Sequence, residues 1–139
     1  MPDLLVVFID SNILFSTCYR SPNLFERLWT IPNVRIVTAG YCVSEVRRNL
    51  RSSEQTGRLD QWLSRTHIVE DCPESEFPET LMLPAKDVPV LAAAAHCKAD
   101  ILITGDRNHF GRYYGHQVFG VFVESSEMFR SRFPEIFLR

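Results

Sequence analysis

Residues 4–9 restrict the fold of this chain more than any other segment, because they form an unbroken apolar run, LLVVFI. The run has the length of a strand, is rich in β-branched and aromatic residues, and does not alternate between apolar and polar positions. Strands covered on both faces in a parallel sheet have this pattern. The run ends at Asp10, and in open α/β sheets ligands bind outside the carboxyl ends of the strands. We therefore predict a central parallel strand, and Asp10 is a candidate for chemistry.

Strand-like and helical patterns alternate along the rest of the sequence. Further strands are predicted at residues 34–39, 67–70, 99–106 and 117–123. Helices are predicted at residues 12–29 with a break at Ser21 and Pro22, at 41–50, around 55–65, at 87–98 and at 125–133, and residues 71–85 are predicted to be a loop. This alternation is typical of an α/β protein with one parallel sheet and helices on both faces. With no internal repeat or linker, residues 1–139 are interpreted as a single domain.

Composition excludes several other classes of protein. The formal net charge of −2 gives no global positive field that would attract nucleic acid. The four cysteines are far apart and form no C-x-x-C motif, so neither a zinc site nor a disulfide framework is expected. The N-terminus lacks the features of a signal peptide, and no apolar run approaches the ~18 residues of a membrane span. A cytoplasmic location is expected.

Four acidic residues are predicted to meet at one edge of the sheet. Asp10 and Asp106 each end a predicted strand, and carboxyl ends of parallel strands lie at the same edge. Glu45 and Asp87 lie near the starts of helices on that edge. Grouped carboxylates repel one another unless a cation lies between them, and hard oxygen ligands suit Mg²⁺ or Mn²⁺. Asp87 is equally well placed to cap its helix, and this alternative stays open.

The segments FIDSNIL, SEV, KDVPVLAAA and ADILITGD, in this order and spacing, closely resemble the PIN-domain ribonucleases. The resemblance covers essentially the whole chain. It implies a PIN-like three-layer α/β/α fold with a five-stranded parallel sheet in the order 3-2-1-4-5. It also implies a metal-dependent endoribonuclease that hydrolyses RNA phosphodiester bonds, of the type that includes the toxins of toxin–antitoxin pairs.

The resemblance also implies roles for individual residues. The catalytic and metal-binding quartet, which would hold one or two Mg²⁺ or Mn²⁺ ions, is Asp10, Glu45, Asp87 and Asp106. Supporting polar positions are Ser11, Asn12 and Thr104, together with Asn108, which stands where many members of the family have a further acid. RNA is the implied substrate, and an antitoxin protein and a homodimer remain partners to be tested.

Several basic residues could hold RNA phosphates. Arg47, Arg48 and Arg51 belong to the helix of Glu45, and Arg107 and His109 follow Asp106. For the three helix arginines, the alternative is an ordinary solvated face.

A second functional class stays open beside the nuclease. The chain could keep the fold and act as a catalytically weak RNA-binding or partner-binding module, which Asn108 and the acidic residues of segment 70–79 favour. Other acid-bearing α/β folds fit less well. A dehalogenase-type phosphatase needs an Asp at position 12, where this chain has Asn12. A receiver domain needs acids that are missing here, and no phosphate-binding glycine motif occurs.

Overall fold

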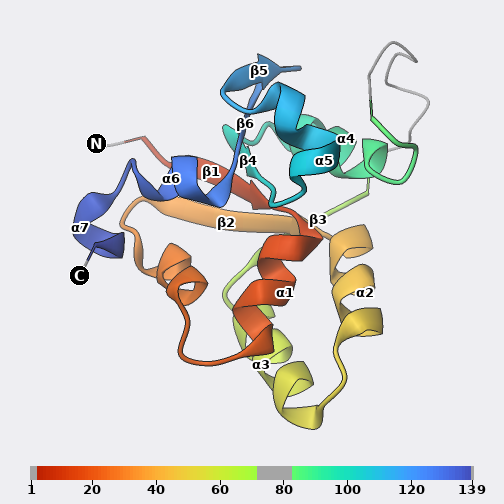
Figure 1. The fold of residues 1–139 in the computed structure, drawn as a ribbon, viewed down its shortest axis with the longest axis vertical. Coiled ribbons are helices and arrows are strands. Elements are labelled where there is room, and N and C mark those ends of the chain that lie inside the picture. The colour runs from red at the N-terminus through yellow and green to blue at the C-terminus, as the bar shows by residue number, and fades with distance from the viewer. Residues whose placement is uncertain (1–2, 72–82, 139) are drawn as a thin grey trace.

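A computed structural model describes residues 3–71 and 83–138 (Figure 1). Its sheet has six strands, in the spatial order β3 (His67–Val69), β2 (Val34–Ala39), β1 (Leu5–Ile9), β4 (Ile101–Ile103), β6 (Val121–Glu124) and β5 (His116–Val118). Every neighbouring pair is parallel except β5 with β6, which is antiparallel. The α/β class is confirmed, and the expected order 3-2-1-4 is kept by the first four strands, but β6 takes the place beside β4 and β5 is added beyond it at the edge.

The fifth predicted strand, residues 117–123, is wrong as a single strand. The chain reverses at Phe119 and Gly120, whose φ angles are 50° and 83°. Two consecutive residues with positive φ make the tight turn of a two-residue hairpin. The hairpin pairs Val118 with Val121 and adds β5 as an antiparallel edge strand, so the sheet has six strands and is mixed.

The turn supports a prediction about two exposed glycines. Gly120→Ala should lower the free energy of unfolding by about 1 kcal/mol, because a Cβ at positive φ is strained. Gly57→Ala is the matched control, since Gly57 lies inside helix α3 and a Cβ there meets nothing within 4 Å. That control should raise the free energy of unfolding by roughly 0.5–1 kcal/mol. Denaturant unfolding measures the free energy of unfolding of both variants. Equal changes in the two variants would contradict the hairpin turn.

The helical segments connect the strands. Their bounds are α1 (Ser11–Tyr19), η1 (Leu24–Thr30), α2 (Gly40–Asn49), α3 (Ser53–Leu63), α4 (Val88–His96), α5 (Arg107–Phe110), η3 (Gly111–Tyr113), α6 (Ser126–Arg130) and α7 (Pro134–Phe137). The predicted helix 12–29 is broken as expected, and its second part is a 3₁₀ helix. The predicted closing helix is shorter and is followed by α7. Most of the predicted loop 71–85 lies outside the described residues.

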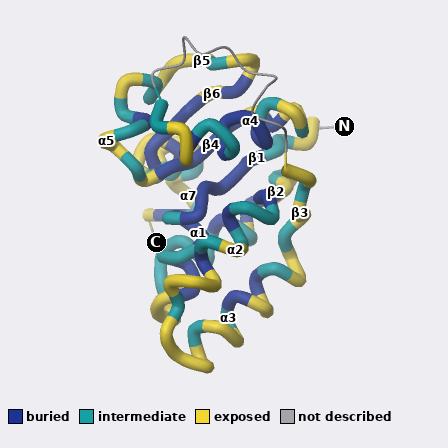
Figure 2. The backbone as a smooth tube through the Cα atoms, turned by 90° about the vertical axis from the view of Figure 1, so that its right-hand side faces the viewer, coloured by how far each residue is buried: buried dark blue, intermediate teal, exposed yellow. Residues whose placement is uncertain are grey.

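The sheet separates two apolar cores. Val7 and Ile9 face a cluster that includes residues of α1, α3 and α6, whereas Phe8 faces a cluster that includes residues of α4 and α5. In Figure 1, α1 and α3 lie below β2, whereas α4 and α5 lie above it. Figure 2 shows β1 and β4 as buried in the middle of the molecule. Because both faces of β1 are covered, every position of this strand can be apolar.

Within residues 3–71 and 83–138, no helix combines the length and the apolar character needed to cross a membrane. Cys18, Cys42 and Cys97, the three cysteines that the structure describes, are free thiols.

Candidate active site

The register of the two central strands brings Asp10 opposite Thr104. Ile9 pairs with Ile103, and the backbone N–H of Asp10 still donates to the Ile103 carbonyl at 3.0 Å. The Thr104 hydroxyl donates to Asp10 Oδ2 at 2.7 Å, and the backbone N–H of Ser11 donates to Oδ1 at 2.7 Å. Asp10 therefore caps helix α1 and is held across the gap between β1 and β4.

Asn12 links the same two loops. Its side-chain oxygen accepts the backbone N–H of Gly105 at 2.7 Å, and its amide nitrogen lies 3.3 Å from Asp10 Oδ2. A Cβ at position 105 would lie 3.2 Å from the Asn12 oxygen, a close approach that glycine accommodates. Ser11, Asn12 and Thr104 thus lie around Asp10 and orient its carboxylate.

A pocket of about 640 Å³ opens beside Asp10 at the carboxyl edge of the sheet. All four predicted acids line it. The full lining is Asp10, Ser11, Asn12, Phe15, Ser16, Glu45, Val46, Asn49, Arg51, Lys86, Asp87, Gly105 and Asp106. Helices α1 and α2 and the residues that begin α4 and α5 therefore surround one concave surface.

Asp87 occupies the N-cap position of α4 but does not act as a cap. Its backbone is helical, with φ −98° and ψ −15°, and its side chain accepts no capping hydrogen bond from the described residues. Capping residues usually have extended backbone angles. The carboxylate turns instead toward His109, with Oδ2 2.7 Å from Nδ1. The capping interpretation of Asp87 is therefore wrong for this structure.

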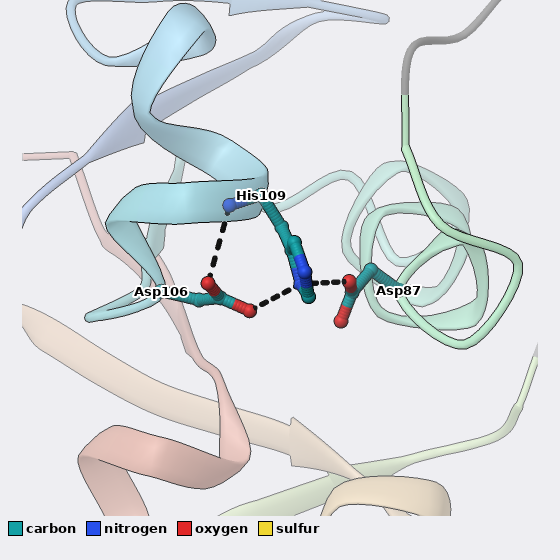
Figure 3. Close-up of side chains that lie close together, drawn as sticks. All are labelled: Asp87, Asp106 and His109. Atoms are coloured by element: carbon teal, nitrogen blue, oxygen red, sulfur yellow. Dashed lines mark hydrogen bonds and ion pairs between the residues drawn. The ribbon is translucent and has the colours of Figure 1, made fainter.

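His109 lies between two of the acids (Figure 3). Its Nδ1 is 2.7 Å from Asp87 Oδ2 and 2.7 Å from Asp106 Oδ2. Its backbone N–H donates to the other oxygen of Asp106 at 3.2 Å, which fixes the first turn of α5. Among the described residues, Asp87 Oδ2 and His109 Nδ1 are both buried without a partner in hydrogen-bond geometry, although the two atoms lie 2.7 Å apart.

Burial dominates the electrostatics of the acids. It raises the pKa of Asp10 from 3.8 to about 6, against the lowering effect of the hydrogen bonds from Thr104 and Ser11, and the charges of Asp87 and Glu45 raise it further. Burial also raises the pKa of Asp87, and His109 opposes that shift. Both carboxylates are thus costly to ionise without a cation beside them.

Other predicted residues lie away from the pocket lining. Asn108 is exposed and does not line the pocket. Arg47 pairs with Asp60 at 2.7 Å, and Arg107 lies 3.9 Å from Glu127. Arg48 is exposed outside the lining. Arg51 lies beyond the end of α2 and not on that helix as predicted, and it is the predicted arginine that lines the pocket.

Six lining residues were not predicted as site residues from the sequence: Phe15, Ser16, Val46, Asn49, Lys86 and Gly105. Phe15 and Ser16 lie one turn after Ser11 and Asn12, and Asn49 lies one turn after Glu45, so helical spacing from the predicted acids and polar residues could have identified them. Lys86 directly precedes Asp87 and could have been found by adjacency.

The donors present fit a divalent cation. Carboxylate oxygens suit Mg²⁺ and Mn²⁺, and the buried oxygen of Asp87 lacks a hydrogen-bond partner among the described residues. Asp87, Asp106 and His109 also offer three ligand atoms within 4.8 Å of one another. The arrangement can therefore hold positive charge at the pocket.

Comparisons with known proteins address the fold. No family model and no curated protein matches the sequence. Among solved structures, VapBC2 from Rickettsia felis bound to a DNA fragment from their promoter is similar, with a TM-score of 0.63 and 18% identity over 87% of this chain and 98% of that chain. PAE2754 from Pyrobaculum aerophilum has a TM-score of 0.62 and 16% identity over 92% of this chain and 88% of that chain. VapBC-1 from nontypeable Haemophilus influenzae has a TM-score of 0.52 and 16% identity over 78% of this chain and 92% of that chain. The chain has the PIN-like α/β fold of these structures.

Proposed function

We propose that this protein is a metal-dependent endoribonuclease that hydrolyses RNA phosphodiester bonds. The observation that carries the proposal is the convergence of Asp10, Glu45, Asp87 and Asp106 on one open pocket. Asp10 and Asp87 have raised pKa values there, so they favour a cation as a partner. The resemblance to PIN-domain ribonucleases supplies the reaction class.

The four acids would hold Mg²⁺ or Mn²⁺, one or two ions. When bound, such an ion supplies Lewis acidity toward water and toward the phosphate oxygens. This chain's own residues orient the site: the Thr104 hydroxyl and the Ser11 backbone N–H hold both oxygens of Asp10. The side chain of Asn12 accepts a hydrogen bond from the backbone of Gly105, which links the segments that follow β1 and β4.

RNA is supported as the substrate by the residues at the rim. Arg51 and Lys86 line the same pocket as the acids, so positive side chains are available for the phosphates of a bound strand. The acids alone would repel RNA, which makes these two cations important for binding.

We also propose that the protein is the toxin of a toxin–antitoxin pair and has an antitoxin partner. Two of the similar structures are VapBC complexes, whose VapC component is a PIN-domain ribonuclease. A cytoplasmic location and a homodimer would be consistent with this role.

A metal titration tests the nuclease. The purified protein is mixed with a labelled single-stranded RNA and increasing Mn²⁺, and products are resolved on a denaturing gel. Cleavage that rises with Mn²⁺ and stops on addition of EDTA is expected. If the RNA stays intact at every Mn²⁺ concentration while the protein still binds it, the second candidate, a PIN-fold RNA-binding module, replaces the nuclease. Asn108, which stands where many PIN-domain ribonucleases have a further acid, favours that second candidate.

Arg51 should contribute more to RNA binding than an exposed arginine elsewhere. Arg51→Gln is expected to weaken binding of single-stranded RNA and to reduce the slope of log K against log salt by about 0.7, the value for one lost phosphate contact. Arg35→Gln is the control, because Arg35 is exposed near the start of β2, at the opposite end of the strand from the pocket. If the slope of log K against log salt is the same for both variants, Arg51 does not contact an RNA phosphate.

A further inference from the structure

We infer that His109 is a ligand of the divalent ion, and that its Nδ1 makes this site favour a first-row transition ion such as Mn²⁺ over Mg²⁺. The inference rests on the proposed function, since it concerns the ion of the same pocket. It adds a ligand of a different chemical type to Asp87 and Asp106, the two acids of the quartet whose oxygens lie near Nδ1.

Two segments that are distant in the sequence bring the ligand atoms together (Figure 3). Asp87 directly precedes α4, whereas Asp106 is the N-cap of α5 and His109 lies within that helix. Their ligand atoms all lie within 4.8 Å of one another. The backbone hydrogen bond from His109 to Asp106 keeps the imidazole on the side of the two carboxylates.

The contacts between these side chains are short but leave the buried atoms unsatisfied. Asp87 is 8% exposed, and its Oδ2 has no partner in hydrogen-bond geometry within the described part of the chain. Nδ1 of His109 is also buried without a partner in hydrogen-bond geometry among the described residues, although Oδ2 of Asp87 and Oδ2 of Asp106 each lie 2.7 Å from it. A single ring N–H cannot point at two acceptors on different sides. A cation between the three atoms would satisfy all of them, with Nδ1 as the unprotonated ring nitrogen.

The donor set predicts the preference among ions. Mg²⁺ prefers oxygen ligands and water, whereas an imidazole nitrogen binds first-row transition ions more readily. With oxygen ligands alone the pocket would discriminate little between Mg²⁺ and Mn²⁺. With Nδ1 added, the affinity for Mn²⁺ should exceed that for Mg²⁺, and Co²⁺ should bind still more tightly, following the usual order of affinities.

Two measurements on the whole chain test this ligand without depending on activity. Calorimetric titration gives the affinities for Mn²⁺ and for Mg²⁺, and pulsed electron paramagnetic resonance of the Mn²⁺-loaded protein detects coupling to a ligand nitrogen. We expect a ¹⁴N coupling that changes when the protein is made with ¹⁵N-histidine, a test that needs no substitution. In His109→Ala the coupling should vanish and the Mn²⁺ affinity should fall by roughly tenfold or more, with a much smaller change for Mg²⁺. His116→Ala, which removes an exposed histidine in β5, should keep the coupling and both affinities.

The outcomes separate this inference from the proposed function. Mn²⁺ binding with EDTA-sensitive RNA cleavage but without nitrogen coupling would overturn His109 as a ligand and leave the nuclease standing. Unchanged Mn²⁺ affinity in His109→Ala would do the same, and His109→Asn, with a melting curve recorded without metal, provides a second variant if the alanine protein folds poorly. Absence of any divalent-ion binding would overturn both.

Discussion

Asp10→Asn is expected to abolish Mn²⁺-dependent RNA cleavage, with a loss of rate on the order of a hundredfold or more. Asp10 is the most buried of the four acids, and its two oxygens are oriented by Thr104 and Ser11. Asparagine keeps the size of the side chain and one oxygen for the Ser11 N–H, but it removes the charge that would hold the ion. Gel-based cleavage assays at saturating Mn²⁺ measure the effect.

The same substitution should make the metal-free protein more stable at neutral pH. The folded-state pKa of Asp10 is about 6, above its ordinary 3.8, so folding favours the protonated carboxyl. The stability that this preference contributes is complete below about pH 4 and is lost as the pH rises through 6. Above pH 6 the ionised carboxylate therefore costs roughly 3 kcal/mol, a cost that the asparagine variant avoids. The stability of the variant relative to the parent should rise between pH 4 and 6 and then stay constant.

Asp3→Asn is the control for both effects. Asp3 is exposed before β1, at the opposite end of this strand from Asp10. Its substitution should leave cleavage and the pH profile of unfolding at the parent values. If Asp10→Asn cuts RNA at the parent rate, Asp10 does not hold the ion. If the variant has the parent's pH profile, the raised pKa is wrong.

Asp87→Ser and Asp87→Ala should lose Mn²⁺ affinity by about tenfold or more and yet unfold with nearly the same free energy as each other. Serine could replace a lost cap and alanine could not, so a capping role would separate the two variants by about 1 kcal/mol. Asp87 accepts no capping hydrogen bond from the described residues, and its carboxylate faces His109. Because burial raises the pKa of this carboxyl, neither variant should be less stable than the metal-free parent at pH 7. Calorimetric Mn²⁺ titrations and denaturant unfolding without metal provide the two readouts.

Ser52→Ala supplies the opposite pattern as a control. Ser52 caps α3 through a capping box, with its hydroxyl accepting the Gln55 backbone N–H at 3.1 Å. Its loss should lower the free energy of unfolding by about 1 kcal/mol and leave Mn²⁺ affinity unchanged. If Asp87→Ala resembled Ser52→Ala in both measurements, Asp87 would be a cap and the site would have three acids.

The sequence by itself determined how strands and helices alternate along the chain. It also determined that the candidate site lies at the carboxyl edge of the sheet. The apolar run that ends at Asp10 predicts a strand covered on both faces, and the structure covers it on both faces. The acids of the quartet could be placed because strand and helix ends are local features, marked by where the apolar pattern stops. The hairpin at Phe119 and Gly120 was missed because the apolar pattern continues through the turn, and one glycine carries little local signal.

The tertiary structure decided which side chains contact each other. Asp87 has the identity and position of a helix cap, and nothing near it in the sequence distinguishes a cap from a carboxylate that faces a histidine. That choice depends on His109, which is brought beside it by the packing of α5 against the start of α4. In the same way, Arg47 and Arg51 belong to one basic segment of the sequence, but α3 supplies Asp60 to Arg47, while Arg51 lies beyond the end of α2 and lines the pocket. Contacts between distant segments depend on how the elements pack, and periodicity within each element carries no information about them.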